Sequence, residues 1–271
     1  MSRTYETILV NTRDGITTLT LNRPEKMNPI NPTMVKEITE VMDEIAYDER
    51  YRVLVITGAG AAFCSGIDLN WGRSPEALSN PWAAHRFYGG PGTEGILGLQ
   101  EKLRLFPLPT IAAVNGWAFA LGFWMAMLCD CVVIARDAHI GVPEMQEPRN
   151  SRMSKTHPGG GTVTSMAFFV PHRFALWHLF TGEDITGEEA ERLLMVNKAV
   201  PAGQLMEEAY KLAERMKKVD PLAFRVLKRS YWRAKNSPYS VDTLELEHME
   251  QSEFASLRQA VGKSAEPGIR Q

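Results

Sequence analysis

The chain has 271 residues, of which 44% are hydrophobic and 23% charged, and its formal net charge is -2. This length and apolar content are enough to bury one large core. The near-neutral charge gives no reason to expect binding to nucleic acid or to an anionic membrane surface. No apolar run reaches transmembrane length and the first residues lack an apolar signal region, so we expect a cytoplasmic protein without a membrane anchor.

The chain opens with the pattern of a β-hairpin followed by an amphipathic helix. Residues 7–11 and 16–21 alternate in the manner of strands and are joined through Asp14-Gly15, a pair typical of tight hairpin turns. Apolar residues then recur between Pro32 and Tyr47 at helical spacing.

Strands and helices alternate after this opening. Residues 53–58 indicate a buried strand, 93–105 a helix and 110–114 a second buried strand. Residues 73–92 contain several prolines and glycines and form the least regular stretch, which we expect to be a loop near the ligand. Repeated β–β–α turns of this kind predict a mixed α/β fold.

Two strand-to-turn units carry the first functional signal. The strand at 53–58 leads into small residues around Gly66, and the run 109–116 ends in a turn before the uncharged stretch 117–129, which predicts a buried helix. Small residues let backbone N–H groups approach a ligand, and a helix N-terminus presents unpaired N–H groups. Two such donors are what a carbonyl oxygen needs as it becomes an oxyanion.

Three cysteines, Cys64, Cys129 and Cys131, lie in apolar contexts without the spacing of metal ligands. We therefore expect buried free thiols in a reducing compartment and no metal site.

Five short motifs resemble, in order and spacing, those of the crotonase (enoyl-CoA hydratase/isomerase) superfamily. The resemblance continues through Leu179–Gly182 and Ala199–Pro201 and so covers nearly the whole chain. The motifs are Asn22-Arg23-Pro24-Glu25-Lys26-Met27-Asn28, Phe63-Cys64-Ser65-Gly66-Ile67-Asp68-Leu69, Val114-Asn115-Gly116-Trp117-Ala118, Met127-Leu128-Cys129-Asp130 and Gly141-Val142-Pro143-Glu144.

The resemblance implies a ββα spiral core followed by an α-helical trimerisation segment. We place the core at residues 1–200 and the helical segment at 201–271. Helices are expected at 207–217, 221–234 and 241–261, and apolar residues on more than one of their faces favour a homotrimer or a dimer of trimers.

The resemblance also implies an acyl-CoA thioester as substrate, with coenzyme A part of that substrate and no separate cofactor. The two oxyanion-hole amides correspond to Ile67 and Leu121. Leu121 and Ala120 stand where the family has glycines, but a backbone N–H survives such a change if φ stays negative at Leu121. Further residues are expected to contact the nucleotide end of CoA or to lie in the adjoining turn, namely Arg23, Lys26, Met27, Cys64, Gly66, Asp68 and Leu69.

The acid/base residues depart from the two-carboxylate pattern of the family's hydratases. The first glutamate position holds Trp124, whereas the second is retained as Glu144. An indole cannot deprotonate a water molecule and its bulk fills part of the water site, so Glu144 is the expected acid/base and Trp124 a substrate contact. The polar segment 145–157 replaces a shorter stretch, and a solvent-exposed insertion is its simplest interpretation.

Several reactions stay open at this point. The run Asn115–Phe123 and the single Glu144 are similar to the hydroxycinnamoyl-CoA hydratase-lyases, although the tyrosine that those enzymes use has no counterpart between Leu244 and Met249. A Δ3,Δ2-enoyl-CoA isomerase also works with one glutamate. A hydrolase of β-dicarbonyl acyl-CoA stays open inside the enzyme class, and a non-catalytic acyl-CoA-binding protein stays open outside it. We expect an enzyme of lyase type, and the sequence does not name the acyl group.

Overall fold

The protein is described from a computed structural model, which covers residues 4–71, 74–79, 94–145 and 161–236 together with the single positions 82, 87, 249, 252 and 256. The chain forms two compact units, Met1–Lys217 and Lys218–Gln271. The domain boundary expected from the sequence, after residue 200, precedes this division and stays a prediction.

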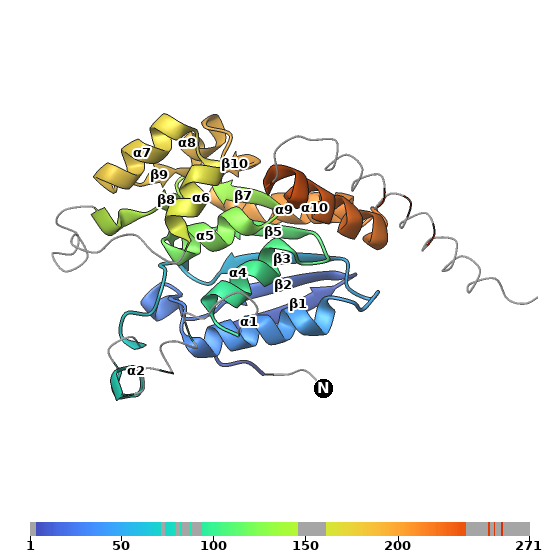
Figure 1. Cartoon of the computed structure of the whole chain (residues 1–271), viewed down its shortest axis with the longest axis horizontal. Coiled ribbons are helices and arrows are strands. Elements are labelled where there is room, and N and C mark those ends of the chain that lie inside the picture. Colours follow the sequence, from blue (N-terminus) through green and yellow to red (C-terminus); the bar gives the residue numbers. More distant parts are fainter. Residues whose placement is uncertain are drawn as a thin grey trace, which may run out of the picture. The chain divides into compact units, whose positions relative to one another are not determined.

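A six-stranded sheet, in the order β1-β2-β3-β5-β7-β10, forms the centre of the first unit (Figure 1). Its strands are β1 (Ile8–Arg13), β2 (Ile16–Leu21), β3 (Val53–Gly58), β5 (Thr110–Val114), β7 (Cys131–Ala135) and β10 (Lys198–Val200). The first two strands are antiparallel, and their turn places Asp14 and Gly15 at φ 51° and 79°. The other pairs are parallel. The predicted hairpin and the predicted buried strands are confirmed.

A second sheet has four strands in the order β4-β6-β8-β9. They are β4 (Ala62–Cys64), β6 (Trp117–Phe119), β8 (His139–Gly141) and β9 (Ile185–Thr186). The first three run parallel, and β9 pairs antiparallel with β8.

The sequence prediction of a helix starting at Trp117 was wrong. Ala118 is buried while Trp117 and Phe119 are half-buried, which is the alternation of a strand with one covered face. Pairing with β4 and β8 holds these residues extended. The helix begins only at Leu121.

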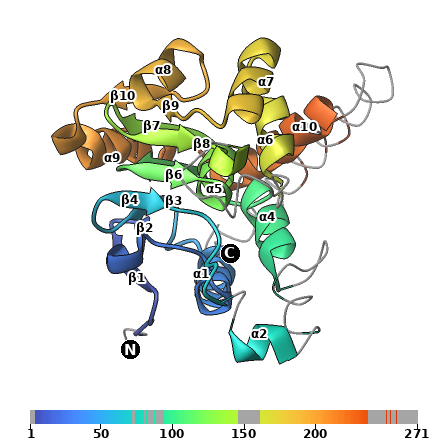
Figure 2. The ribbon, with the colours of Figure 1, turned by 90° about the vertical axis from the view of Figure 1, so that its left-hand side faces the viewer.

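Helices cover both faces of the large sheet (Figures 1 and 2). In the first unit the α-helices are α1 (Pro32–Ile45), α2 (Pro75–Ser79), α4 (Ile96–Arg104), α5 (Leu121–Leu128), α6 (Thr162–Phe169), α7 (His172–Thr181), α8 (Gly187–Arg192) and α9 (Leu205–Met216). Short 3-10 helices span Pro24–Lys26, Pro143–Met145 and Ala202–Gln204. Helix α1 starts where the sequence predicted, with the Asn31 side chain accepting from the Met34 N–H.

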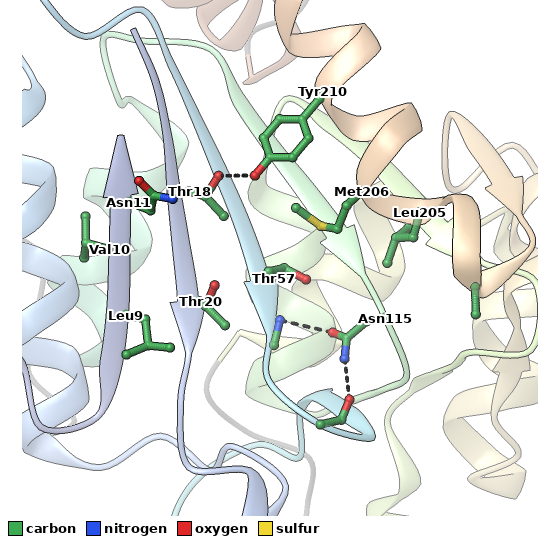
Figure 3. Close-up of a pocket in the computed structure, with 13 residues that line it drawn as sticks. Leu9, Val10, Asn11, Thr18, Thr20, Thr57, Asn115, Leu205, Met206 and Tyr210 are labelled. Atoms are coloured by element: carbon green, nitrogen blue, oxygen red, sulfur yellow. Dashed lines mark hydrogen bonds between the residues drawn. The ribbon is translucent and has the colours of Figure 1, made fainter. Parts of the chain in front are cut away.

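Alternate residues of the strands face two separate cores. Leu54 and Ile56 of β3 belong to the large cluster that includes the apolar face of α1. Val53 and Val55 face the other way, into a smaller cluster with Ala209 and other residues of α9. A hydrogen bond of 2.9 Å between Thr18 Oγ1 and Tyr210 Oη also links α9 to β2, and Figure 3 shows this bond. The period-2 pattern of β3 therefore positions helices on both faces.

The second unit is described through α10 (Pro221–Asn236), a helix that the sequence predicted. Three predicted segments lie largely outside the described residues. They are the helix expected at 241–261, apart from positions 249, 252 and 256, residues 146–157 of the polar insertion, and most of the stretch 73–92. No helix in the described ranges is long and apolar enough to cross a membrane.

Candidate active site

Three parallel strands of the small sheet end at one edge. Cys64 of β4 pairs with Ala118 of β6, and Phe119 of β6 pairs with Gly141 of β8. The Ala120 N–H also donates to the Gly141 carbonyl at 3.0 Å. Segments that follow the carboxyl ends of neighbouring parallel strands meet at the same edge. The three sequence motifs that end these strands therefore come together in space.

The turn after β4 lies against the start of α5. Gly66 has a φ of 108°, and a Cβ added there would lie 3.2 Å from the Ala120 Cβ and 3.8 Å from the Leu121 nitrogen. Glycine is favoured because this backbone conformation and this close approach both disfavour a side chain.

Ile67 presents its backbone N–H at this turn. Ile30 bonds to both neighbours of Ile67, because its N–H donates to the Gly66 carbonyl and its carbonyl accepts from the Asp68 N–H, each at 2.8 Å. This pairing holds Ile67 extended and leaves its own N–H without an acceptor among the described residues.

Leu121 supplies the second backbone donor. It is the first residue of α5, and Ala120 before it makes no side-chain cap. The φ of Leu121 is not positive, which is the condition given above for its backbone N–H to serve as a donor. No group in the described ranges accepts from this N–H, and the partial positive charge of the helix N-terminus adds to it. The two predicted donors are thus close together and unpaired.

Ala120 holds the strained conformation between β6 and α5. Its φ of 49° and ψ of -113° are rarely adopted by residues other than glycine, and such strain costs about 1–3 kcal/mol. Replacing Ala120 by Gly should therefore raise the free energy of unfolding by about 1 kcal/mol after glycine's extra chain entropy is subtracted. Urea denaturation measures this change. Ala126→Gly, inside the same helix, should lower stability instead, and an equal loss in both variants would contradict the assignment of strain.

Arg23 and Asp68, both predicted CoA contacts, form a buried ion pair. The Arg23 Nη2 lies 2.7 Å from the Asp68 Oδ2, and Arg23 Nη1 donates to the Pro29 carbonyl at 2.7 Å. Burial acts to raise the pKa of the Asp68 carboxyl, but the hydrogen bond and charge of Arg23, with help from two backbone N–H groups, outweigh it, so the pKa lies below its ordinary value. The pair therefore fastens the loop at 23–28 to the turn at 64–69.

Lys26, Met27 and Leu69 are accessible at the same two segments. Lys26 is exposed, while Met27 and Leu69 are 38% and 42% exposed. The Met27 carbonyl accepts from the Ser65 N–H at 2.9 Å, so the loop that carries Lys26 and Met27 lies beside the β4 turn. Their predicted contact with CoA stays a prediction.

Two asparagines position these loops. The Asn28 carboxamide accepts from the Arg23 N–H at 2.8 Å and donates to the carbonyls of Ala59 and Ala62. Asn115 accepts from the Gly58 N–H at 3.1 Å and donates to the Gly60 carbonyl at 2.9 Å (Figure 3). Both residues lie within the sequence motifs, but the sequence alone assigned neither a role. An asparagine beside a strand end was the available sequence signal for such a role. Its carboxamide can bond to backbone groups that lack a partner in the sheet.

Glu144 lies in the 3-10 helix Pro143–Met145 that follows β8. The residue is 8% exposed, and its Oε2 has no hydrogen-bond partner among the described residues. Burial raises the pKa of the Glu144 carboxyl above its ordinary value of 4.5, and a bond to its own backbone N–H opposes this weakly. A buried carboxyl with a raised pKa and one unpartnered oxygen is suited to accept and return a proton.

The remaining predicted site residues are buried. Trp124 is 2% exposed and lies one turn into α5, where its backbone N–H donates to the Ala120 carbonyl at 3.0 Å. Cys64 is fully buried, and burial raises the pKa of its thiol to about 12. It is therefore a packed thiol rather than a nucleophile. Burial likewise raises the pKa of Cys131 to about 11.

Comparison with known proteins identifies the family to which this chain belongs. Residues 11–265 match the family model "Enoyl-CoA hydratase/isomerase". The chain is 33% identical over 244 residues to a hydroxycinnamoyl-CoA hydratase-lyase of Pseudomonas fluorescens, covering 85% of this chain and 80% of that protein. It is 30% identical to a probable enoyl-CoA hydratase of Mycobacterium bovis over 97% of this chain and 95% of that protein.

A solved structure shows the same fold. An enoyl-CoA hydratase subunit from Geobacillus kaustophilus superposes with a TM-score of 0.79 at 29% identity, covering 98% of both chains. Sequence, fold and the arrangement of the strand ends agree, and the chain belongs to the enoyl-CoA hydratase/isomerase family.

Proposed function

We propose that the protein transforms an acyl-CoA thioester by proton transfer. In this proposal the N–H groups of Ile67 and Leu121 hold the thioester carbonyl oxygen, and Glu144 moves the proton. The observation that carries the proposal is found at one sheet edge, where two backbone N–H donors and the buried Glu144 Oε2 have no hydrogen-bond partner among the described residues.

The chemistry follows from where charge develops. Removing a proton beside a thioester, or adding a nucleophile to its conjugated double bond, places negative charge on the carbonyl oxygen. Preorganised N–H donors stabilise that charge with little reorganisation. Glu144 takes the proton and gives it back at another carbon or to a leaving oxygen, and its raised pKa makes the carboxyl a stronger base than an exposed glutamate. Coenzyme A enters and leaves as part of the substrate.

With Glu144 as the one proposed acid/base residue, reactions that need a single proton carrier are favoured. Trp124 stands where the hydratases of the family carry their other glutamate, so water addition directed by two carboxylates is disfavoured. Isomerisation of an enoyl-CoA, or a hydratase-lyase reaction, fits better. The similarity to the hydroxycinnamoyl-CoA hydratase-lyase of Pseudomonas fluorescens favours the second of these. Hydrolysis of a β-dicarbonyl acyl-CoA and binding without catalysis are outcomes that the test must separate.

A mass-spectrometric screen tests the proposal. The protein is incubated in D₂O with a panel of saturated, enoyl and hydroxycinnamoyl thioesters of CoA. We expect deuterium incorporation or a product mass for at least one member, and loss of that signal in Glu144→Gln. Binding of thioesters with neither exchange nor product would instead identify a non-catalytic acyl-CoA-binding protein.

We also propose that the protein assembles as a homotrimer or as a dimer of trimers. Large apolar side chains are exposed on α7, where Trp177 and Phe180 are 58% and 71% exposed, and on α10, where Leu227 and Tyr231 are 66% and 54% exposed. Such surfaces are typical of subunit contacts. Light scattering coupled to size exclusion should give three or six times the 30.3 kDa chain mass. A stable monomer at micromolar concentration would refute the assembly.

A further inference from the structure

The two proposed oxyanion donors are held in place by different kinds of structure. Leu121 is the first residue of α5, so the helix itself fixes the direction of its N–H. Ile67 instead lies in the turn after β4, where Gly66 before it adopts a φ of 108°. Backbone bonds of 2.8 Å from Ile30 to Gly66 and to Asp68 hold this turn. The place of the Ile67 N–H therefore depends on what fixes Ile30 and Asp68.

The Arg23 side chain joins the two segments on which Ile67 depends. Its Nη1 donates to the carbonyl of Pro29, the residue before Ile30, at 2.7 Å. Its Nη2 lies 2.7 Å from Oδ2 of Asp68, the residue after Ile67. A guanidinium is planar and rigid, so its two nitrogens fix the spacing between the groups that they bind. One side chain thus spans the backbone pairing that holds the Ile67 N–H.

Both ends of this ion pair are anchored. The Asp68 Oδ1 accepts from the backbone N–H groups of Asn70 at 3.0 Å and Trp71 at 3.2 Å, and the backbone N–H of Arg23 donates to Asn28 Oδ1 at 2.8 Å. The side chains of Arg23 and Asp68 are 12% and 7% exposed, so water and salt screen their attraction little. The pair is therefore a firm link between the two segments and not a loose surface contact.

We propose that Arg23 and Asp68 are positioning residues that hold the Ile67 N–H against the thioester carbonyl oxygen. They act through the backbone of Ile67, without touching the substrate. The direction of this donor decides how well it stabilises an oxyanion, so loosening the pair should lower kcat and leave the affinity for CoA unchanged. A direct contact of either side chain with CoA would lower that affinity instead. The positioning role rests on the proposed function and deepens it.

Infrared difference spectra of a bound thioester test this role, because hydrogen bonds to a carbonyl lower its stretching frequency. Butanoyl-CoA and 3-phenylpropanoyl-CoA, each labelled with ¹³C at the thioester carbonyl, serve as saturated probes. The double variant Arg23→Met/Asp68→Asn leaves no buried charge unpaired, and its new carboxamide still accepts from the N–H groups of Asn70 and Trp71. We expect its carbonyl band to move back toward the frequency in solution.

Two further measurements on the double variant separate positioning from binding. Its kcat for a thioester accepted in the screen should fall by about 10²-fold, the effect of a displacement of roughly 1 Å. Calorimetry should give an unchanged Kd for free CoA. If the double variant does not fold, Arg23→Lys takes its place. Lysine keeps the charge but not the planar guanidinium, so the band should move in the same direction by a smaller amount.

Arg50→Lys is the matched control. The Arg50 Nε donates to both carboxylate oxygens of Asp48, but the Arg50 side chain is 78% exposed and lies outside the proposed site. The carbonyl band, kcat and the Kd for CoA should all stay as in the wild type.

The possible outcomes are distinct. A carbonyl band that does not move in the folded Arg23 and Asp68 variants overturns the positioning role and leaves the proposed function standing. A raised Kd for free CoA also overturns it, because it assigns a direct contact with CoA. If neither probe shows a shifted carbonyl band in the wild-type protein, the proposed function fails and the positioning role fails with it.

Discussion

Replacing Glu144 by Gln should lower turnover of an accepted acyl-CoA by about 10²–10⁴-fold, the usual effect of removing a general acid/base. Glutamine keeps the shape and the polarity of the side chain but cannot exchange a proton. Affinity for the thioester should change little, because the proposed carbonyl donors are backbone N–H groups. Steady-state kinetics together with calorimetric binding measures both quantities. Near-wild-type turnover in this variant would reject Glu144 as the proton carrier.

The pH dependence gives an independent check of the same residue. Burial raises the pKa of Glu144 in the folded protein, so the acidic limb of the pH–rate profile should lie above the ordinary carboxyl pKa of 4.5. The ionised form is disfavoured by folding, so its destabilising effect is absent below the unfolded-state pKa and complete above the folded-state pKa. Glu144→Gln should therefore raise the free energy of unfolding at pH 8 and leave it nearly unchanged at pH 3.

Glu37 provides the matched control for this pair of effects. It is also 8% exposed, but its carboxylate accepts from the Glu6 N–H at 2.6 Å and from the Thr7 N–H at 2.9 Å. Glu37→Gln should therefore destabilise the protein and leave the chemistry of the site unchanged. Glu144→Gln is expected to gain stability and lose turnover, whereas Glu37→Gln is expected to lose stability and keep its turnover. This contrast separates a functional carboxyl from a structural one.

Local periodicity was sufficient to predict much of the first unit. The alternation in β1 and β2, the Asp14-Gly15 turn and the apolar face of α1 are all short-range signals, and each appears where the sequence placed it. The start of α5 was missed because Trp117–Phe119 is as apolar as the helix that follows. Only pairing with the distant strands β4 and β8 makes it a strand.

Long-range contacts also explain what the sequence could not show about the site. Nothing local indicates that Arg23 pairs with Asp68. The family resemblance predicted CoA contacts for both residues, which stays a prediction, and the fold adds an ion pair that fastens two loops. Likewise, Gln100, Trp124 and Gly161 are far apart in the chain and meet only because α5 packs between α4 and α6. Motifs located the proposed carbonyl donors and the carboxyl, while side chains that position or line the site required the fold.

Gly122→Ala should destabilise the protein by about 1–3 kcal/mol, even though alanine is the better helix former. Inside a helix, alanine is favoured over glycine by about 1 kcal/mol. A Cβ at residue 122, however, would lie 2.1 Å from the Cys64 carbonyl oxygen and 2.8 Å from the Cys64 Cβ. Backbone atoms cannot yield as the end of a long side chain can, so overpacking outweighs the gain in helix propensity.

The same collision should disturb the proposed oxyanion site. Cys64 precedes the Gly66–Ile67 turn and Gly122 follows Leu121, so pushing α5 away from β4 separates the two N–H donors. A displacement of about 1 Å can cost roughly 10²-fold in rate, and we expect a loss of that size in kcat. Gly203→Ala is the control, because a Cβ there meets nothing within 4 Å. Its stability should change by less than about 0.5 kcal/mol and its turnover should not change. Equal behaviour of the two variants would contradict the close packing of α5 on β4 as the support of the site.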